Sequence, residues 1–260
     1  NQAGCPYPDK NLAGVGVAFK LVHALFREYG REPQVAAFMK IVAIGTVADV
    51  AKLTGENRTI VAIGLKDLAR AANPGLKALI DVAGCGDGKG MTAYDLGFRL
   101  GPRINAAGRM DAARAVVELF DTRDSAEARR LAEHLDARNE ERKTVQQQII
   151  DLALAELGDS KDAKVAVIEG SGWHRGVIGI AASKIAERLH RPCVVFSIDG
   201  EVAHGSGRSI EAYHLLNGLT ACADLFEKFG GHSHAAGITI RPERIAEFRR
   251  RLNEHAASCL

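Results

Sequence analysis

The sequence lacks the features of a membrane protein and of a disulfide-stabilised protein. No apolar run approaches the roughly 20 residues that a transmembrane helix requires, because Gly, Lys or Asp interrupts each candidate. No charged-then-apolar signal segment opens the chain. The five cysteines are odd in number and form no CxxC pair, which argues against a disulfide framework and against a zinc ribbon. These absences predict a cytoplasmic protein without a membrane partner.

A strong charge of one sign is also missing. The 260 residues carry 34 Lys+Arg and 32 Asp+Glu, a net charge of +2. The charges are unevenly distributed, however. Residues 1–110 carry 14 basic and 9 acidic groups, residues 111–157 carry 7 and 11, and residues 158–260 carry 13 and 12. A basic excess in one segment is compatible with a partner that carries phosphates, so the near-neutral total does not exclude nucleic acid.

The first segment is predicted to be mostly helical. Apolar residues recur at helical spacing in residues 12–29, and further apolar stretches follow at residues 35–47 and 57–72. Pro74 suits the first turn of a short helix that runs to Val82. The glycine-rich run at residues 84–90 predicts a flexible loop.

Proline and glycine are absent from residues 111–157, where charged residues dominate. Apolar residues gather at the two ends of this stretch, and its middle is almost wholly polar. A helix that is polar all round usually bridges two bodies through solvent, so we expect a linker of one or two helices. Asp124 and Ser125 are a plausible helix cap. The alternative is a surface helix of a single domain.

The last segment alternates between strands and helices. Strands are predicted at residues 164–169, 193–197, 201–205 and 236–240, and helices at residues 177–189, 213–229 and 243–256. Such alternation predicts a sheet covered by helices, and therefore an α/β domain.

Two motifs of the first segment are candidates for chemistry. Asp49 ends the otherwise apolar stretch GTVADV, where a buried carboxylate is costly unless it is paired or binds a metal. The alternative reading, which we favour from spacing alone, is a helix C-terminal or capping Asp. In LGPRINAAGR, the side chains of Arg103, Asn105 and Arg109 stand among small residues that allow a ligand to approach. This predicts phosphate binding slightly ahead of a tight turn with solvated arginines.

Three glycine-rich motifs follow in the last segment. GSGWHRG after a predicted strand offers loop amides, a stacking face at Trp173 and donors at His174 and Arg175. GSGRS displays the hydroxyls of Ser206 and Ser209 beside Arg208. FGGHSHAAG combines imidazoles with a flexible turn, and direct hydrogen bonding of His232 to a substrate is preferred over metal ligation. We interpret the three motifs that combine glycine with arginine, LGPRINAAGR, GSGWHRG and GSGRS, as loops that bind polyanions. The remaining histidines that we considered are assigned no function: His23, His134, His190, His214 and His255.

These motifs also carry a family resemblance. LGPRINAAGRM, GTVADV, GWHRGVIGIAASKIAER, GSGRS, FGGHSHAAG and the opening CPYPDKNLAGVGVAFKL resemble the RecJ family of bacterial single-strand-specific exonucleases, within the DHH phosphoesterase superfamily. The similarity runs from end to end. FGGHSHAAG alone would also fit oligonucleotide or cyclic-dinucleotide phosphodiesterases of the superfamily, whereas GPRINAAGR followed by a long linker helix favours RecJ.

The resemblance implies an α/β fold in three parts. These are the mostly helical C-terminal part of a DHH catalytic domain (residues 1–110), a helical linker (residues 111–157) and an α/β DHH-associated, substrate-binding domain with a mixed sheet (residues 158–260). It further implies 5′-to-3′ degradation of single-stranded DNA in repair and recombination, with two Mn²⁺ or Mg²⁺ ions and a water nucleophile. Single-strand-binding protein and a helicase are candidate partners.

The resemblance also implies roles for individual residues. Asp49 matches the last metal-binding aspartate of the family, and Arg103, Asn105 and Arg109 match an element near the scissile or terminal phosphate. The expected DNA-handling face comprises Trp173, His174, Arg175, Ser206, Arg208, Ser209 and His232.

The chain departs from the family pattern in one respect. The Asp, Asp-x-Asp and Asp-His-His motifs that hold the other metal ligands occur nowhere in the 260 residues, and residue 1 is Asn. We therefore expect a fragment whose remaining metal ligands precede Asn1, and which is inactive by itself. The alternatives are an oligonucleotide or cyclic-dinucleotide phosphodiesterase, and a non-catalytic single-stranded nucleic-acid-binding module.

Overall fold

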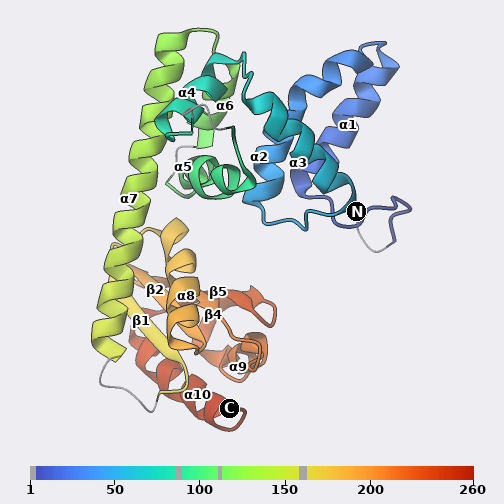
Figure 1. Ribbon diagram of the computed structural model, residues 1–260. Coiled ribbons are helices and arrows are strands. Elements are labelled where there is room, and N and C mark those ends of the chain that lie inside the picture. Colours follow the sequence, from blue (N-terminus) through green and yellow to red (C-terminus); the bar gives the residue numbers. More distant parts are fainter. Residues whose placement is uncertain (1–3, 86–89, 111–112, 158–162) are drawn as a thin grey trace. The chain divides into compact units, whose positions relative to one another are not determined.

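A computed structural model describes residues 4–85, 90–110, 113–157 and 163–260 of the chain (Figure 1). These residues form two compact units, Asn1–Asn139 (unit 1) and Glu140–Leu260 (unit 2). Within the described ranges, no helix is long and apolar enough to cross a membrane. The predicted loop at residues 84–90 falls mostly outside the residues that the structure describes.

Unit 1 is helical, as the sequence predicts. Its elements are α1 (Gly14–Glu28), the 3-10 segment η1 (Glu32–Phe38), α2 (Met39–Ala48), α3 (Gly55–Leu68), α4 (Pro74–Val82), the π-helical turn η2 (Asp95–Leu100), α5 (Gly101–Arg109), α6 (Ala113–Asp121) and the first part of α7 (Ser125–Leu157). Helix α4 begins as expected, because Pro74 lies in its first turn and the Leu76 amide donates to the Asn73 side chain at 2.8 Å.

Glycines allow the helices of unit 1 to approach one another closely. A Cβ atom on Gly64 of α3 would lie 2.4 Å from the Ala43 Cβ atom of α2. One on Gly75 of α4 would lie only 1.7 Å from the Leu119 carbonyl oxygen of α6. Because no larger residue fits at either position, these glycines set the distances between the helices that surround the core.

Helix α7 contributes to both cores. It begins at the predicted cap, where the Asp124 carboxylate accepts the amide hydrogens of Ala126 and Glu127 at 2.7 and 3.2 Å. In the part of α7 that belongs to unit 1, apolar side chains at helical spacing are buried. In the part beyond Asn139, which belongs to unit 2, a second group of apolar side chains is buried. These positions are Ala128, Leu131, Ala132 and Leu135 in the first set and Ile149, Ile150 and Ala153 in the second.

Unit 2 contains a five-stranded mixed sheet, which confirms the α/β fold with a mixed sheet that the resemblance implies. Its elements after α7 are β1 (Ala166–Ser171), α8 (Arg175–Leu189), β2 (Cys193–Asp199), β3 (Val202–Arg208), α9 (Leu215–Thr220), η3 (Ala223–Leu225), β4 (Phe226–Gly231), β5 (Ala235–Ile240), η4 (Pro242–Arg244) and α10 (Ile245–Ala257). The strand order is β1-β2-β3-β5-β4, with β1 and β2 parallel and the other neighbours antiparallel.

The two faces of this sheet are covered differently. Alternate side chains of the strands, such as Phe196, Ala203 and Ile238, join a core with α9 and α10. The opposite face is covered by α8, which contacts β2 and β3 and lies against the sheet in Figure 1. The part of this face over β5, β4 and residues 204–206 of β3 lines an open groove.

Three sequence predictions of local structure are wrong. Residues 101–109 form helix α5 rather than a loop, because Pro102 suits the first turn and the helix buries Ala106 and Ala107. GSGRS lies mainly in β3, because it is paired through backbone hydrogen bonds. The turn predicted in FGGHSHAAG is present, and residues 232–234 connect β4 to β5. Helix α9 ends at Thr220, and residues 226–229 form strand β4 because Phe226 and Phe229 pack on the sheet core.

Candidate nucleic-acid interface and phosphate site

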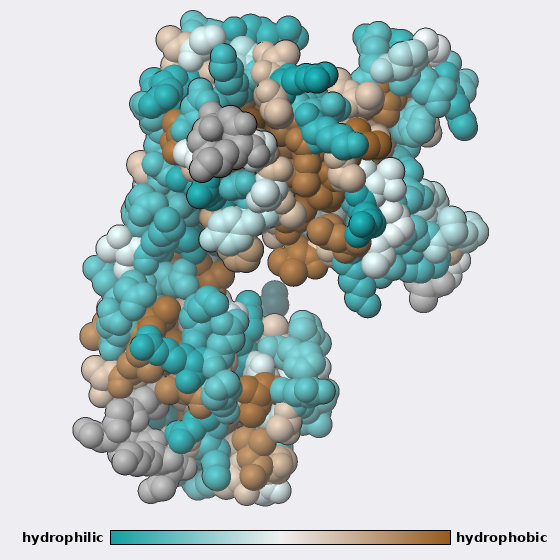
Figure 2. Space-filling model, viewed as in Figure 1, coloured by the Kyte–Doolittle hydropathy of each residue, from teal (hydrophilic) through white to brown (hydrophobic). Residues whose placement is uncertain are grey.

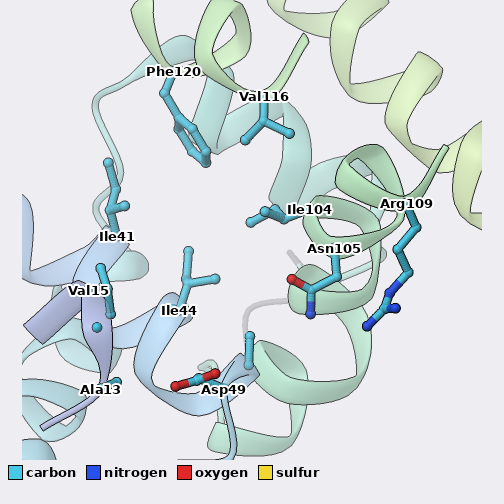
Figure 3. A pocket seen from close by; sticks show the side chains of 13 residues that line it. Ala13, Val15, Ile41, Ile44, Asp49, Ile104, Asn105, Arg109, Val116 and Phe120 are labelled. Carbon is cyan, nitrogen blue, oxygen red and sulfur yellow. The ribbon is translucent and has the colours of Figure 1, made fainter. Parts of the chain in front are cut away.

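In unit 1, the predicted residues Asp49, Asn105 and Arg109 line one open cavity of about 740 Å³ (Figure 3). Asn105 and Arg109 project from α5, and Asp49 follows α2. The rest of the wall is largely apolar and comes from α1, α2, α5 and α6. In Figure 2, hydrophobic side chains are accordingly visible over α2. The cavity thus combines one carboxylate, one amide and one guanidinium on an apolar support.

The ends of α2 and α5 hold Asp49 in place. A Cβ atom on Gly101 would lie 2.9 Å from the Ala48 Cβ atom, so only glycine lets the start of α5 approach the last turn of α2. Asp49 is the C-cap residue of α2, and its amide donates to the Gly45 carbonyl at 3.0 Å. Val50 then adopts the left-handed conformation with a φ of 54° while 88% exposed. A β-branched residue is strained there, so the turn that presents Asp49 carries a conformational cost.

Arg103 lies away from this cavity. Its Nη2 atom lies 2.8 Å from Asp136 Oδ1 of α7, as an ion pair rather than an aligned hydrogen bond, and its Nη1 atom donates to the Arg99 carbonyl at 2.7 Å. Only 13% of the Arg103 side chain is exposed. The sequence groups Arg103 with Asn105 and Arg109, but helix α5 directs Arg103 to α7 and the other two side chains to the cavity.

The cavity does not by itself fit a two-metal centre. Asp49 is the one carboxylate among the described residues that line it, and the guanidinium of Arg109 stands in the same wall. In the described part of the chain, no three His, Cys, Asp or Glu side chains lie close enough to hold a metal ion. Asp49 can supply one ligand, and Asn105 and Arg109 can bind phosphate oxygens.

In unit 2, the uncovered face of the sheet forms a groove of about 510 Å³, lined by β3, β5, β4 and the start of α8. Directly paired residues of antiparallel strands share a face, so the register defines rows across the groove. Ser206 pairs with Gly237, which pairs with Gly230. A Cβ atom on either glycine would meet no atom within 4 Å. The floor of the groove is therefore bare backbone, and a ligand can lie close to it.

Ser206 and Arg208 point to this open face, as the alternation of β3 requires. The Arg208 Nη1 atom donates to Ser206 Oγ at 3.1 Å and to the Gly207 carbonyl at 2.7 Å. A Cβ atom on Gly179 of α8 would lie 3.0 Å from Ser206 Oγ and 3.2 Å from Arg208 Nη2. The glycine in α8 thus leaves room for both side chains between helix and strand.

The start of α8 places three of the predicted residues. Arg175 lines the groove and forms an exposed ion pair with Asp199 at 3.1 Å. The Nδ1 atom of His174 accepts the amide hydrogen of Gly176 at 3.1 Å, so this ring caps the helix. The Trp173 indole lies against Gly170, where a Cβ atom would be 2.3 Å from the ring. Trp173 and His174 lie outside the lining of the groove.

Ser209 and His232 also lie outside the lining of the groove. The Ser209 hydroxyl donates to the Tyr213 carbonyl at 2.7 Å, and its amide donates to the His234 carbonyl at 3.0 Å. His232 is exposed, and its Nδ1 atom accepts the His234 amide hydrogen at 3.3 Å. In this structure the polar atoms of Ser209 therefore tie β3 to the β4–β5 turn.

The sequence reasoning missed three residues of the groove. His204, Thr239 and Lys228 form a second row, because His204 pairs with Thr239 and Thr239 with Lys228. Burial and the Arg175 guanidinium lower the pKa of the His204 imidazole. Alternation along residues 202–208 was the available signal, since it places His204 on the same face as Ser206 and Arg208.

Comparison with known proteins first defines the class of unit 2. Residues 162–258 match the family model described as the DHHA1 domain. This is the DHH-associated domain that the resemblance implies, and the groove lies entirely within the matched residues.

The whole chain is similar to RecJ. It is 43% identical over 262 residues to the single-stranded-DNA-specific exonuclease RecJ of Bacillus subtilis. This alignment covers 100% of this chain and 33% of that protein. RecJ of Escherichia coli is 41% identical over 276 residues, covering 98% of this chain and 48% of that protein. The crystal structure of Thermus thermophilus RecJ in complex with Mg²⁺ matches with a TM-score of 0.85 and 33% identity, over 97% of this chain and 39% of that one.

These comparisons confirm the resemblance to RecJ, and the similarity extends over the whole of this chain. Another similar structure is exonuclease RecJ bound to manganese, with a TM-score of 0.85, 33% identity and coverage of 98% of this chain and 63% of that one. The metal ions in these structures are those that the resemblance implies. The chain spans between a third and a half of the length of the curated relatives cited here.

Proposed function

We propose that this chain is a core part of a metal-dependent 5′-to-3′ single-stranded DNA exonuclease that acts in DNA repair and recombination. Unit 2 binds the single strand, and unit 1 contributes Asp49 as one ligand of a metal site. The resemblance implies that the other ligands lie in the Asp, Asp-x-Asp and Asp-His-His motifs, which do not occur in these 260 residues. Asn105 and Arg109 hold a phosphate of the substrate beside that site.

The observation that carries this proposal is the groove of unit 2. Its floor is bare backbone at Gly230 and Gly237, and the cationic side chains of Arg175 and Lys228 line it. Arg208 lies outside the lining but on the same face of the sheet, hydrogen-bonded to the lining residue Ser206. Phosphate contacts of this kind do not read sequence, so they suit an enzyme that degrades any single strand.

Binding is tested with fluorescein-labelled oligothymidylates of increasing length and with a dithymidine dinucleotide. We expect affinity to rise with length and to fall steeply with salt, because a strand that contacts several cations releases several counterions. Equal affinity for the dinucleotide would support the oligonucleotide or cyclic-dinucleotide phosphodiesterase instead. Absence of binding to any of these probes would overturn the proposal for unit 2.

Cleavage is tested separately with Mn²⁺ and a 5′-labelled single strand. We expect the isolated chain to bind without degrading the strand, and the full-length protein to degrade it until Asp49 is replaced by Ala. Binding should survive this replacement. Degradation by the isolated chain would show that its residues complete a metal site. An active full-length Asp49→Ala variant would leave Asp49 with its structural role at the end of α2 alone. The resemblance also points to single-strand-binding protein, a helicase and the cytoplasm, which co-purification and localisation would test.

A further inference from the structure

Two rows of paired residues cross the groove. One row contains Lys228, Thr239 and His204, and the other contains Gly230, Gly237 and Ser206. On each strand, the two rows are separated by two residues. Two residues of a strand span about 7 Å, a separation comparable with that of neighbouring phosphates on an extended single strand. The β-bulge between Phe226 and Lys228 shifts the register of β4. It thereby turns Lys228 onto the same face as Thr239.

We infer that the row Lys228, Thr239 and His204 binds the phosphate next to the one bound at Ser206 and Arg208, and that His204 takes up a proton when this phosphate binds. The inference rests on the proposed binding of single-stranded nucleic acid by unit 2. The Lys228 ammonium and the Thr239 hydroxyl donate to the phosphate at any physiological pH. The His204 imidazole offers a second charged donor only when it is protonated.

The surroundings of His204 explain why the proton is added on binding. The imidazole is partly buried, and no hydrogen-bond partner for it occurs among the described residues. Arg175 of α8 disfavours its protonation, whereas Asp199 of β2 and Glu227 of β4 favour it. Lys228 of β4 and Arg208 of β3 add positive charge on the same face, and Thr239 of β5 is uncharged. In the free protein the imidazole is therefore neutral near neutral pH.

A bound phosphate reverses this balance. Its negative charge offsets Arg175 and Lys228 and accepts a hydrogen bond from the imidazolium, so the pKa of His204 is higher in the complex than in the free protein. Affinity must then rise as the pH falls through the interval between these two pKa values. One fully coupled proton changes the dissociation constant by about tenfold per pH unit within the interval.

The test measures the anisotropy of a labelled oligothymidylate of about 20 nucleotides, from about pH 5 to pH 8 at constant ionic strength. We expect the wild-type chain to bind more tightly as the pH falls. His204→Gln should remove most of this dependence and match the wild type at high pH. His204→Lys should bind tightly with a flat profile. His23→Gln, a change of a histidine in unit 1, should keep the wild-type profile.

A His204→Gln variant with the full wild-type pH dependence would overturn the inference, and so would a wild-type chain whose affinity does not change with pH. Both outcomes can be separated from failure of the proposed function. Binding at pH 8 that Arg208→Gln weakens would keep unit 2 as a single-strand-binding domain whatever His204 does. Circular dichroism of each variant across the same pH range checks that the fold is retained.

Discussion

Units 1 and 2 each contain a short motif of glycine and arginine, residues 101–109 and residues 205–208, and the two motifs direct their side chains differently. In helix α5, Arg103 and Arg109 are six residues apart, so their side chains leave the axis about 120° apart. One reaches Asp136 and the other lines the cavity. In strand β3, Ser206 and Arg208 are two residues apart and share a face. Similar compositions thus direct one of two arginines to the cavity in a helix, and place two polar side chains on one face in a strand.

The glycines of the two units differ in a related way. In unit 1, Gly64, Gly75 and Gly101 admit the atoms of a neighbouring helix. In unit 2, Gly205 admits the Phe196 ring on the core side of β3, whereas Gly230 and Gly237 face open space. Glycine therefore serves packing in the helical unit, and it serves both packing and ligand access in the sheet. Three pairs of variants test the packing glycines, the two arginine motifs and the turn at Val50, in order of decreasing expected effect.

Gly75→Ala should have the largest effect. The new Cβ atom would lie 1.7 Å from the Leu119 carbonyl oxygen, so α4 and α6 must separate. We expect the free energy of unfolding to fall by about 3 kcal/mol, measured by urea denaturation followed by circular dichroism. The matched control is Gly108→Ala in α5, where a Cβ atom meets nothing within 4 Å. It should gain about 0.5 to 1 kcal/mol. Equal midpoints for the two variants would contradict the close contact of α4 with α6.

Arg208→Gln and Arg103→Gln test the two motifs directly. Arg208→Gln should weaken binding of a labelled single strand about tenfold and reduce the salt slope by about one, because it removes one phosphate contact. Arg103→Gln should leave binding unchanged and lower the free energy of unfolding by about 1 to 2 kcal/mol, because Asp136 loses its ion pair. If Arg103→Gln instead weakened binding without loss of stability, Arg103 would belong to the phosphate site that the sequence predicts, together with Asn105 and Arg109.

Val50→Asn should have the smallest effect. Val50 and His190 are the two described residues other than glycine with a positive φ, and only Val50 is β-branched. Asparagine tolerates the left-handed conformation, so we expect a gain of about 1 kcal/mol in the free energy of unfolding. Val117→Asn, on the exposed face of helix α6, should leave the free energy of unfolding nearly unchanged, because valine and asparagine have similar helix propensities. A loss of stability in Val50→Asn would show that the valine side chain stabilises this turn.

The sequence predicted the elements whose signals are local. Pro74 and Asp124 begin helices as expected, and the α/β alternation beyond residue 163 is confirmed. The prediction of loops at residues 101–109 and 205–209 is wrong, because glycine was taken as a loop residue. The atoms that fill the space beside a glycine come from distant segments, which the local sequence does not reveal. Ala48 lies beside Gly101, and Phe196 beside Gly205. The grouping of Arg103 with Arg109 failed for the same reason, because Asp136 of α7 is 33 positions away in sequence.

His204 and Lys228 could not be selected from residue type alone. Their position depends on the strand register and on a bulge in β4, and neither leaves a clear mark in the sequence. The predicted roles of Asp49 and of the residues around the groove stay predictions, to be tested by the variants above.

Trp173 gives unit 2 an intrinsic optical reporter. It is the chain's single tryptophan, its indole lies against Gly170, and its carbonyl accepts the Ser197 hydroxyl at 2.5 Å. Arg175, two residues further along, lines the groove. The tryptophan emission of the unmodified protein therefore comes from one known position beside the groove. Occupancy of the groove can be followed by quenching or a wavelength shift of this emission, without attaching a dye to protein or nucleic acid.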